Sequence, residues 1–307
     1  MVETVPQGSW ATVPATSPGY GPPARFATRM RGYRIIGATL SLLVLAVLWG
    51  IAVNTRTGQL VDTLTMDAAG AHLDLGIASS RALGALVSLP TLIAIGIFIL
   101  VVTTVRGRLG LAVRAVLVFA GANVATQLLK DHLSRPRLGI GHPLENSFPS
   151  GHVTVVASLS VVLIAIVPIG ARALMTYVAA ALTSLVGVVV MSLGWHRLSD
   201  VVAAIAISAF FGLLALPSEW VPQRPRIWGS FLAWVSTLAV IASVIALFVV
   251  ILKLPFGPGV VTAQTINNVA SHPNPGVYVA VICVGIIVGS SGIMASSIDR
   301  LAGGTPR

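Results

Sequence analysis

Apolar runs of about twenty residues dominate the sequence, and this is the length that an α-helix needs to cross the hydrocarbon core of a bilayer. The runs cover residues 35–53, 82–105, 109–129, 151–169, 173–193, 200–217, 228–252 and 275–297. Only 9% of the 307 residues are charged, whereas a soluble domain carries about 25%. Because lipid offers no hydrogen-bond partners to the backbone, such runs are expected to be helical. The sequence therefore predicts an all-α, polytopic integral membrane helical bundle with eight spans.

Composition divides the chain into three expected segments. Residues 1–33 are rich in Pro, Gly, Ser and Thr, and we expect them to form a disordered cytoplasmic tail. Residues 34–216 are predicted to form a core of six spans. Residues 217–307 are predicted to hold a basic, proline-containing connector followed by two additional transmembrane helices.

The net charge of +10 is compatible with nucleic-acid binding, but the positions of the charges argue against it. The basic residues lie between the spans, where they set the orientation of a membrane protein. With eight spans and both termini in the cytoplasm, twelve of the 19 Lys and Arg residues fall on the cytoplasmic side. We therefore expect a protein of the cytoplasmic (cell) membrane that does not bind nucleic acid.

No spacing of cysteines and histidines typical of a metal site is present, and no glycine-rich nucleotide-binding loop. We therefore expect neither a metal nor a cofactor. The single cysteine, Cys283, lies inside an apolar run and excludes an intrachain disulfide.

Three weaker local signals concern packing. Residues 54–80 are predicted to be a polar loop in which 60–77 can form a short interfacial helix. Asn123 and Gln127 are four apart in one span, which favours hydrogen bonding between helices, or else support of a polar site. Residues 285–289 read Gly-Ile-Ile-Val-Gly, a pattern that allows close helix approach. Packing within the chain is its more common use, and dimerisation is the alternative.

Three polar clusters stand at the ends of apolar runs. They cover residues 130–137 (KDHLSRPR), 148–152 (FPSGH) and 194–200 (GWHRLSD). Taken singly, the lysine and arginines read as membrane-surface charges, and Ser-Gly-His is most often a helix cap. The predicted topology, however, places all three clusters together on the outer face. Histidines, cations and a carboxylate at one membrane surface indicate a site that handles phosphate.

The second cluster can hold an anion. Ser150 and Gly151 lie where a helix is predicted to begin, so free backbone N–H groups and the positive end of the helix dipole can face a phosphate. Ser150 is also a suitable N-cap residue. Lys130 and Arg137 can neutralise phosphoryl oxygens, the arginine through its planar fork.

The third cluster can supply a nucleophile. His196 and Asp200 are four apart, so they share a face if this turn is helical. A carboxylate bonded to one ring nitrogen fixes the tautomer and leaves the other nitrogen free to attack phosphorus. His152 then remains as the acid that protonates the leaving group.

The first two clusters resemble motifs of the type 2 phosphatidic acid phosphatase superfamily, whose membrane members dephosphorylate lipid phosphates and pyrophosphates. Its first motif is Lys, six residues and Arg-Pro, which Lys130 and Arg137 match, with Leu138 in place of the proline. Its second motif is Pro-Ser-Gly-His, which residues 149–152 match completely.

The third cluster resembles the third motif, which is Ser-Arg, five residues, His, three residues and Asp. His196 and Asp200 match, whereas the Ser-Arg pair falls on Val189 and Val190. The resemblance covers about residues 34–216. A lost charge-assisted contact to phosphate costs roughly 1.5–3 kcal/mol, and we expect Arg135 or Arg197 to compensate in part.

The resemblance implies a role for each matched residue. His196 would be the nucleophile that forms a phosphohistidine, His152 the acid, and Asp200 the group that orients His196. Lys130, Arg137, Ser150 and Gly151 would bind phosphate, and no metal would be required.

The function expected from the resemblance is hydrolysis of a lipid phosphate at the outer membrane face. Polyprenyl pyrophosphate, phosphatidic acid and phosphatidylglycerol phosphate all fit, with a polyprenyl carrier preferred by analogy. Two alternatives remain open, namely a phosphotransferase on the same scaffold and a catalytically silent membrane scaffold homologue.

Overall fold

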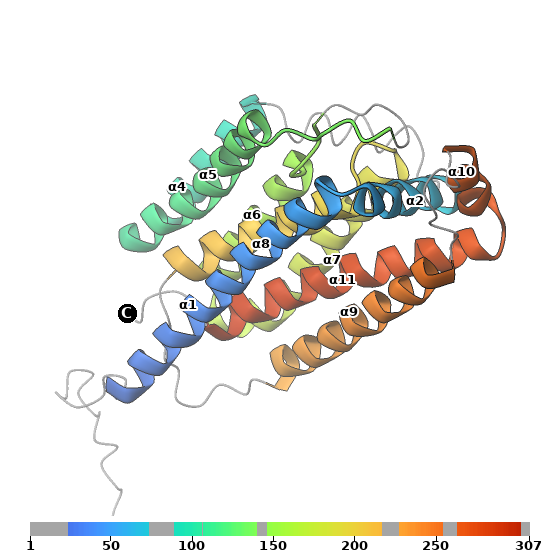
Figure 1. Cartoon of the computed structure of the whole chain (residues 1–307). Helices are drawn as coiled ribbons and strands as arrows, with labels where there is room; N and C mark the ends of the chain where they lie inside the picture. Colours follow the sequence, from blue (N-terminus) through green and yellow to red (C-terminus); the bar gives the residue numbers. More distant parts are fainter. Residues whose placement is uncertain are drawn as a thin grey trace, which may run out of the picture.

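The computed structural model describes residues 24–73, 89–105, 107–139, 146–216, 227–253 and 263–301 (Figure 1). Over these residues the protein is a bundle of helices without strands, which confirms the predicted fold class. The first 23 residues of the predicted tail and the connector at 217–226 lie outside the described residues.

The helices follow the predicted spans closely. In chain order they are α1 (Ala24–Val47) with a π-helical continuation (Leu48–Val53), α2 (Arg56–His72), α4 (Leu89–Val105), α5 (Leu109–His132), α6 (Gly151–Ile166), α7 (Arg172–Ser192) with a preceding 3₁₀ turn (Ile169–Ala171), α8 (Leu198–Ala215), α9 (Ile227–Lys253), α10 (Ala263–Ser271) and α11 (Pro275–Leu301). By length and composition α1, α5, α7, α8, α9 and α11 can cross a membrane, and α4 and α6 are apolar but shorter.

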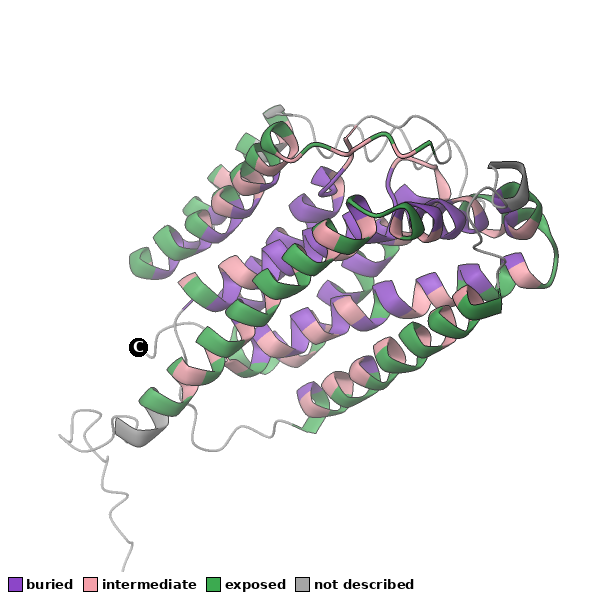
Figure 2. Cartoon of the chain, in the orientation of Figure 1, coloured by how far each residue is buried: buried purple, intermediate pink, exposed green. Residues whose placement is uncertain are grey.

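Helix α8 lies at the centre of the bundle. It packs against α1, α5, α6 and α11, and most of its residues are buried (Figure 2). A helix that is apolar on all sides is stable only when other helices or lipid surround it. Helix α9 shows the opposite case, because Trp228, Phe231 and Trp234 are exposed on it, as expected for a helix that faces lipid.

Glycines bring α11 against α9. A Cβ atom at Gly289 would lie 2.7 Å from the carbonyl oxygen of Ser236 on α9, and Cβ atoms at Gly285 and Gly292 would also meet α9 side chains. The small-residue pattern predicted from the sequence is therefore used for packing within the chain. Helix α11 also contacts α6, α7 and α8.

Helix α2 confirms a helix within residues 60–77 but corrects its expected place at the membrane interface; residues 74–80 lie outside the described residues. The helix begins at Arg56, where the preceding Thr55 accepts a hydrogen bond from the Gly58 N–H, and it ends at His72. It is buried against α11, α7 and α10 rather than lying as a loop or a surface helix. Its polar residues, among them Gln59 and Asp62, are satisfied by partners inside the protein, so they did not mark a solvated segment.

Polar side chains join α5 to α6. Asn123 donates to the Ser158 hydroxyl at 3.2 Å, and the hydroxyls of Thr126 and Thr154 lie 3.0 Å apart. Hydrogen bonding between helices, predicted for Asn123, is thus confirmed.

Gly212 of α8 offers a test of this packing. A Cβ there would lie 2.6 Å from Val161 of α6 and 2.7 Å from Ile298 of α11, so Gly212→Leu is expected to destabilise the protein by about 1–3 kcal/mol through overpacking. Thermal unfolding in detergent measures this change. Gly96→Leu on α4 is the control, because no atom lies within 4 Å of its Cβ position. An equal melting temperature for both variants would contradict the packing.

Candidate active site

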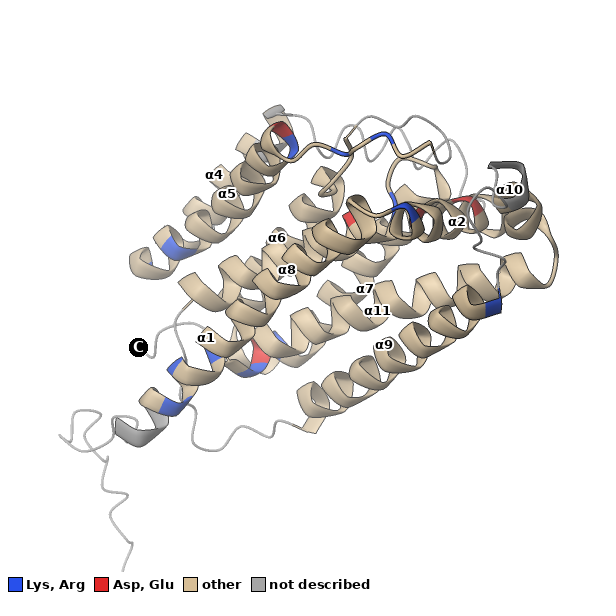
Figure 3. Ribbon diagram, viewed as in Figure 1, with Lys and Arg blue, Asp and Glu red and all other residues tan. Residues whose placement is uncertain are grey.

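The three polar clusters meet at one end of the bundle, which we call the site end. It holds the C-terminus of α5, the loop 133–139, and the N-termini of α6 and α8. Charged residues of α5, the following loop and α2 gather there (Figure 3). The three clusters, which extend from residue 130 to residue 200, therefore lie together with α2 at one site.

The two candidate catalytic histidines lie together. The ring centroids of His152 and His196 are 5.8 Å apart, and the His152 ring is 5.2 Å from the ring of Trp195. His196 belongs to the turn between α7 and α8, in which the N–H groups of Trp195 and His196 donate to the Val190 carbonyl. Gly194 allows this turn, because it has a φ of +69°, a value that suits glycine.

The Asp200 carboxylate is fully buried and collects partners from several segments. Arg135 Nη2 donates to Oδ1 at 2.9 Å, while the Ser147 hydroxyl and the Arg197 N–H donate to Oδ2 at 2.6 and 3.0 Å. His196 Nδ1 lies 3.6 Å from Oδ2. That distance is too long for a hydrogen bond, but catalytic contacts often shorten only when substrate binds.

The N-terminus of α6 is built as predicted. The Ser150 hydroxyl accepts from the Val153 N–H, which makes Ser150 the N-cap, and the Ser150 N–H donates to the Asp200 carbonyl at 3.0 Å. A Cβ at Gly151 would lie 3.7 Å from Lys130 Nζ. The structure thus brings an ammonium group to the positive end of a helix, a combination suited to anion binding.

The three arginines differ in their surroundings. Arg135 is buried between two carboxylates, because its Nη1 also lies 3.8 Å from Asp62. Arg137 is exposed, and the structure shows no hydrogen bond or ion pair from it to the other clusters. Arg197 is buried, and it is the extended residue directly before α8.

Arg197 remains close to the other charges of the site. Its Nη1 lies 3.5 Å from the Ser147 hydroxyl. Burial and the neighbouring Arg135 lower the pKa of its guanidinium, while Asp200 raises it.

Sequence reasoning missed Asp62. This carboxylate of α2 accepts from the Ser199 N–H at 3.0 Å and from the Ser199 hydroxyl, directly beside Asp200. Burial, followed by the nearby charge of Asp200, raises the pKa of Asp62 to about 6, although Arg135 acts against this shift. No motif marks Asp62, and the available signal was its place one helical turn before Met66, which is buried.

Two amides hold the loops of the site. Gln59 donates to the carbonyls of Val53 and Pro136, and Asn146 donates to the carbonyl of Lys130. Across the described residues, no three His, Cys, Asp or Glu side chains are placed to hold a metal ion.

The raised pKa of Asp62 predicts a pH dependence of stability. A raised carboxyl pKa favours the protonated folded form, so this contribution is full below the ordinary value of 3.8 and is lost as the pH rises through about 6. The melting temperature of the wild type should therefore fall more between about pH 5 and about pH 7 than that of Asp62→Asn. Asp131→Asn, which changes an exposed carboxylate of α5, should keep the wild-type profile. Parallel profiles for wild type and Asp62→Asn would refute the assignment.

A family model agrees with the arrangement of the site. Residues 138–224 match the model of the PAP2 superfamily, and this range includes both histidines and Asp200 but begins after Lys130 and Arg137. No curated protein and no solved structure matches the chain. The match supports the resemblance to this superfamily over the second and third motifs, and residues 138–224 of the chain are similar to the PAP2 superfamily.

Proposed function

We propose that the protein is a membrane lipid-phosphate phosphatase that works through a phosphohistidine intermediate. The PAP2 match supports a phosphatase-type function on lipid phosphates, and the apolar helices make this an integral membrane protein. The observation that carries the proposal is the pairing of His152 with His196, beside the N-terminus of α6 and the Lys130 ammonium.

In the first step, His196 attacks the phosphorus atom. Its Nδ1 faces Asp200, so Nε2 is the nitrogen that forms the bond to phosphorus. The bond from phosphorus to the lipid oxygen breaks, the electron pair stays with that oxygen, and His152 gives it a proton.

In the second step, water replaces the histidine. His152, now unprotonated, takes a proton from the water as its oxygen attacks phosphorus, and the P–N bond breaks with its electrons returning to Nε2. Inorganic phosphate leaves, and both histidines regain their starting states. Asp200 keeps the His196 ring oriented throughout.

Phosphate binding is assigned to Lys130, Arg137, Ser150 and Gly151, with Arg135 and Arg197 as auxiliary groups. Nε and Nη1 of Arg135 and Nε of Arg197 are buried and lack a hydrogen-bond partner within the described residues. Buried N–H groups of this kind are costly unless an acceptor reaches them, and phosphoryl oxygens are such acceptors. This supports the idea that the two arginines compensate for Val190.

The substrate is proposed to be a lipid whose phosphate lies at headgroup height, because the site is at the end of the bundle. Polyprenyl pyrophosphate, phosphatidic acid and phosphatidylglycerol phosphate fit, with the polyprenyl carrier preferred by analogy. We place the site on the outer face of the cell membrane and both termini in the cytoplasm, as the distribution of basic residues favours.

The two alternative functions differ from hydrolysis in their products. A phosphotransferase would give a product that depends on an added alcohol acceptor. A silent scaffold homologue would release no phosphate, and the replacement of the third-motif arginine by Val190 is the observation in its favour.

The first test is phosphate release by the purified protein from a panel of lipid phosphates with EDTA present. We expect release to persist in EDTA and to be abolished in His196→Ala, because the nucleophile is gone. His272→Ala changes an exposed histidine far along the chain and should behave as wild type. If no lipid gave more release than the His196→Ala background, the silent-homologue reading would replace the proposal.

The second test separates two arginines of the loop 133–139. Arg135→Ala leaves two buried carboxylates without their cation, so kcat should fall by about ten- to a hundredfold, as expected for roughly 1.5–3 kcal/mol. Arg137→Ala removes an exposed cation and should mainly raise KM. Steady-state kinetics on the best substrate distinguishes the two effects. The proposed roles fail if Arg137→Ala lowers kcat as much as Arg135→Ala does.

A further inference from the structure

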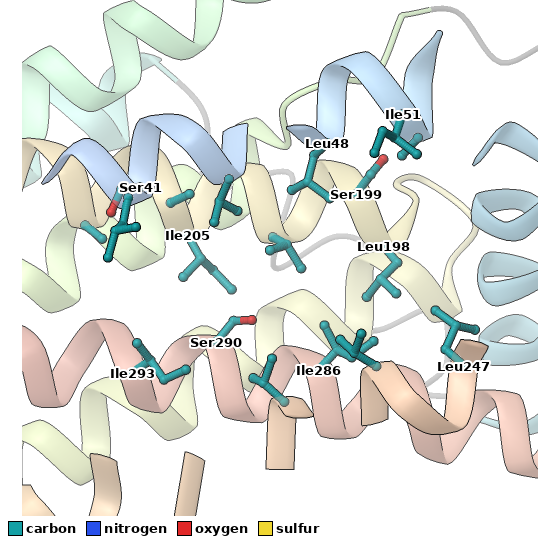
Figure 4. A pocket seen from close by; sticks show the side chains of 18 of the residues that line it. Ser41, Leu48, Ile51, Leu198, Ser199, Ile205, Leu247, Ile286, Ser290 and Ile293 are labelled. Carbon is teal, nitrogen blue, oxygen red and sulfur yellow. The ribbon is translucent and has the colours of Figure 1, made fainter. Parts of the chain in front are cut away.

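An apolar groove runs along α8 on the side away from α5 and α6. Helices α1 and α9 border it, and α8 and α11 line its base (Figure 4). Its volume is about 620 Å³. Most of the lining side chains are aliphatic, for example Val44, Ile205, Val244 and Ile286.

The groove and the catalytic cluster use different faces of α8. The lining residues of α8 include Leu198, Val202, Ile205 and Ala209, which share one helix face through their spacing of three and four. Asp200 does not line the groove, and its carboxylate meets Arg135 and Ser147 from the segment between α5 and α6. His152 and His196 do not line it either. The groove therefore adjoins the candidate site of phosphoryl transfer at Asp62 and Ser199, while both histidines and Asp200 lie outside it.

The polar end of the groove carries a carboxylate and hydroxyls. Among the lining residues that the structure describes, Asp62 is the one ionisable side chain, and Ser199 lies bonded to it. No Lys, Arg or His is among the described lining residues to hold a phosphate, whereas the lone pairs of the Asp62 carboxylate can accept from a hydroxyl. Arg56 and Lys253 lie close in sequence to lining residues, but both are exposed and neither lines the groove.

We propose that this groove binds an uncharged lipid with a hydroxyl headgroup. Its hydrocarbon chain lies along α8 between α1 and α9, and its hydroxyl donates to Asp62 beside Ser199. The groove faces the apolar interior of a membrane, so a hydrocarbon chain rather than water is its natural occupant. Hydrolysis of a lipid phosphomonoester would yield an alcohol of this class. Only this connection between the groove ligand and the reaction product rests on the proposed function.

The proposal assigns a role to the two C-terminal spans. Helices α9 and α11 lie outside the matched segment 138–224, yet they supply one side of the groove through residues such as Val240, Val244 and Ile286. Without α9 and α11, the groove-lining face of α8 would contact bulk lipid. No enclosed groove would then remain for the hydrocarbon chain of one lipid.

Photolabelling of the full-length protein in lipid vesicles tests the proposal. The probe is a long-chain alcohol with a diazirine on its chain, and the labelled residues are mapped by mass spectrometry. We expect labels on groove residues of α8, α9 and α11, and loss of these labels in Val244→Trp, whose side chain fills the groove. Val249→Trp is the matched control, because Val249 is an exposed valine of the same helix that does not line the groove.

Competition decides the chemical class. Unlabelled alcohol should displace the probe, whereas the phosphate ester of the same chain should not. Equal displacement by the ester, or labelling that Val244→Trp leaves unchanged, would overturn the proposal.

The same labelling in His196→Ala separates this proposal from the proposed function. Labels are expected to persist in this variant, because His196 does not line the groove. Groove labels on a wild-type protein that releases no phosphate from any lipid would support the lipid site while the phosphatase assignment fails. Normal phosphate release without groove labels rejects the lipid site alone.

Discussion

The buried carboxylate of Asp200 is the constraint on which the site end depends. An ionised carboxylate without solvent is stable only when it is paired and fully hydrogen-bonded. Its partners come from separate segments, namely Arg135 after α5, Ser147 before α6 and the Arg197 N–H before α8. The Asp200 carbonyl also accepts from Ser150 at the start of α6. Asp200 thus connects the segments that carry both histidines. The hydrogen bonds around its carboxylate form one network, so the loss of one partner is expected to weaken the others.

The features that could be predicted from the sequence are those with a local cause. Hydropathy predicted the membrane-spanning helices. Ser150 and Gly151 predicted the start of α6, because an N-cap residue bonds only to residues close to it in sequence. The pairing of Arg135 with Asp200 and of Asp62 with Ser199 joins residues 65 and 137 positions apart, which no local pattern encodes. For the same reason the α2 region was predicted as a polar loop with a short interfacial helix and not as a buried helix, since its carboxylate and amide find their partners only in the folded protein.

The turn that carries His196 explains why the third motif keeps its geometry without its arginine. Val190 is buried, and its carbonyl accepts from the N–H groups of Trp195 and His196. Any residue supplies that carbonyl, so the backbone role of position 190 survives the exchange, and only the side-chain charge is lost. Positive charge near Asp200 comes instead from Arg135 and Arg197, both buried there. In the proposed mechanism, different residues therefore place the nucleophile and neutralise its substrate.

Helix α11 is as much a part of the central packing as the helices before it. Cβ atoms at Gly187 of α7 and Gly212 of α8 would lie 2.9 and 2.7 Å from Ile287 and Ile298 of α11. These isoleucines fill the space that the glycines leave, and both are fully buried. A bundle without α11 would carry two unfilled gaps beside the helix that begins at the catalytic turn, and unfilled core volume is destabilising. A second set of glycines on α11, Gly285, Gly289 and Gly292, brings this helix close to α9. Helix α11 therefore contributes both to the core packing and to the position of α9 beside the proposed lipid groove.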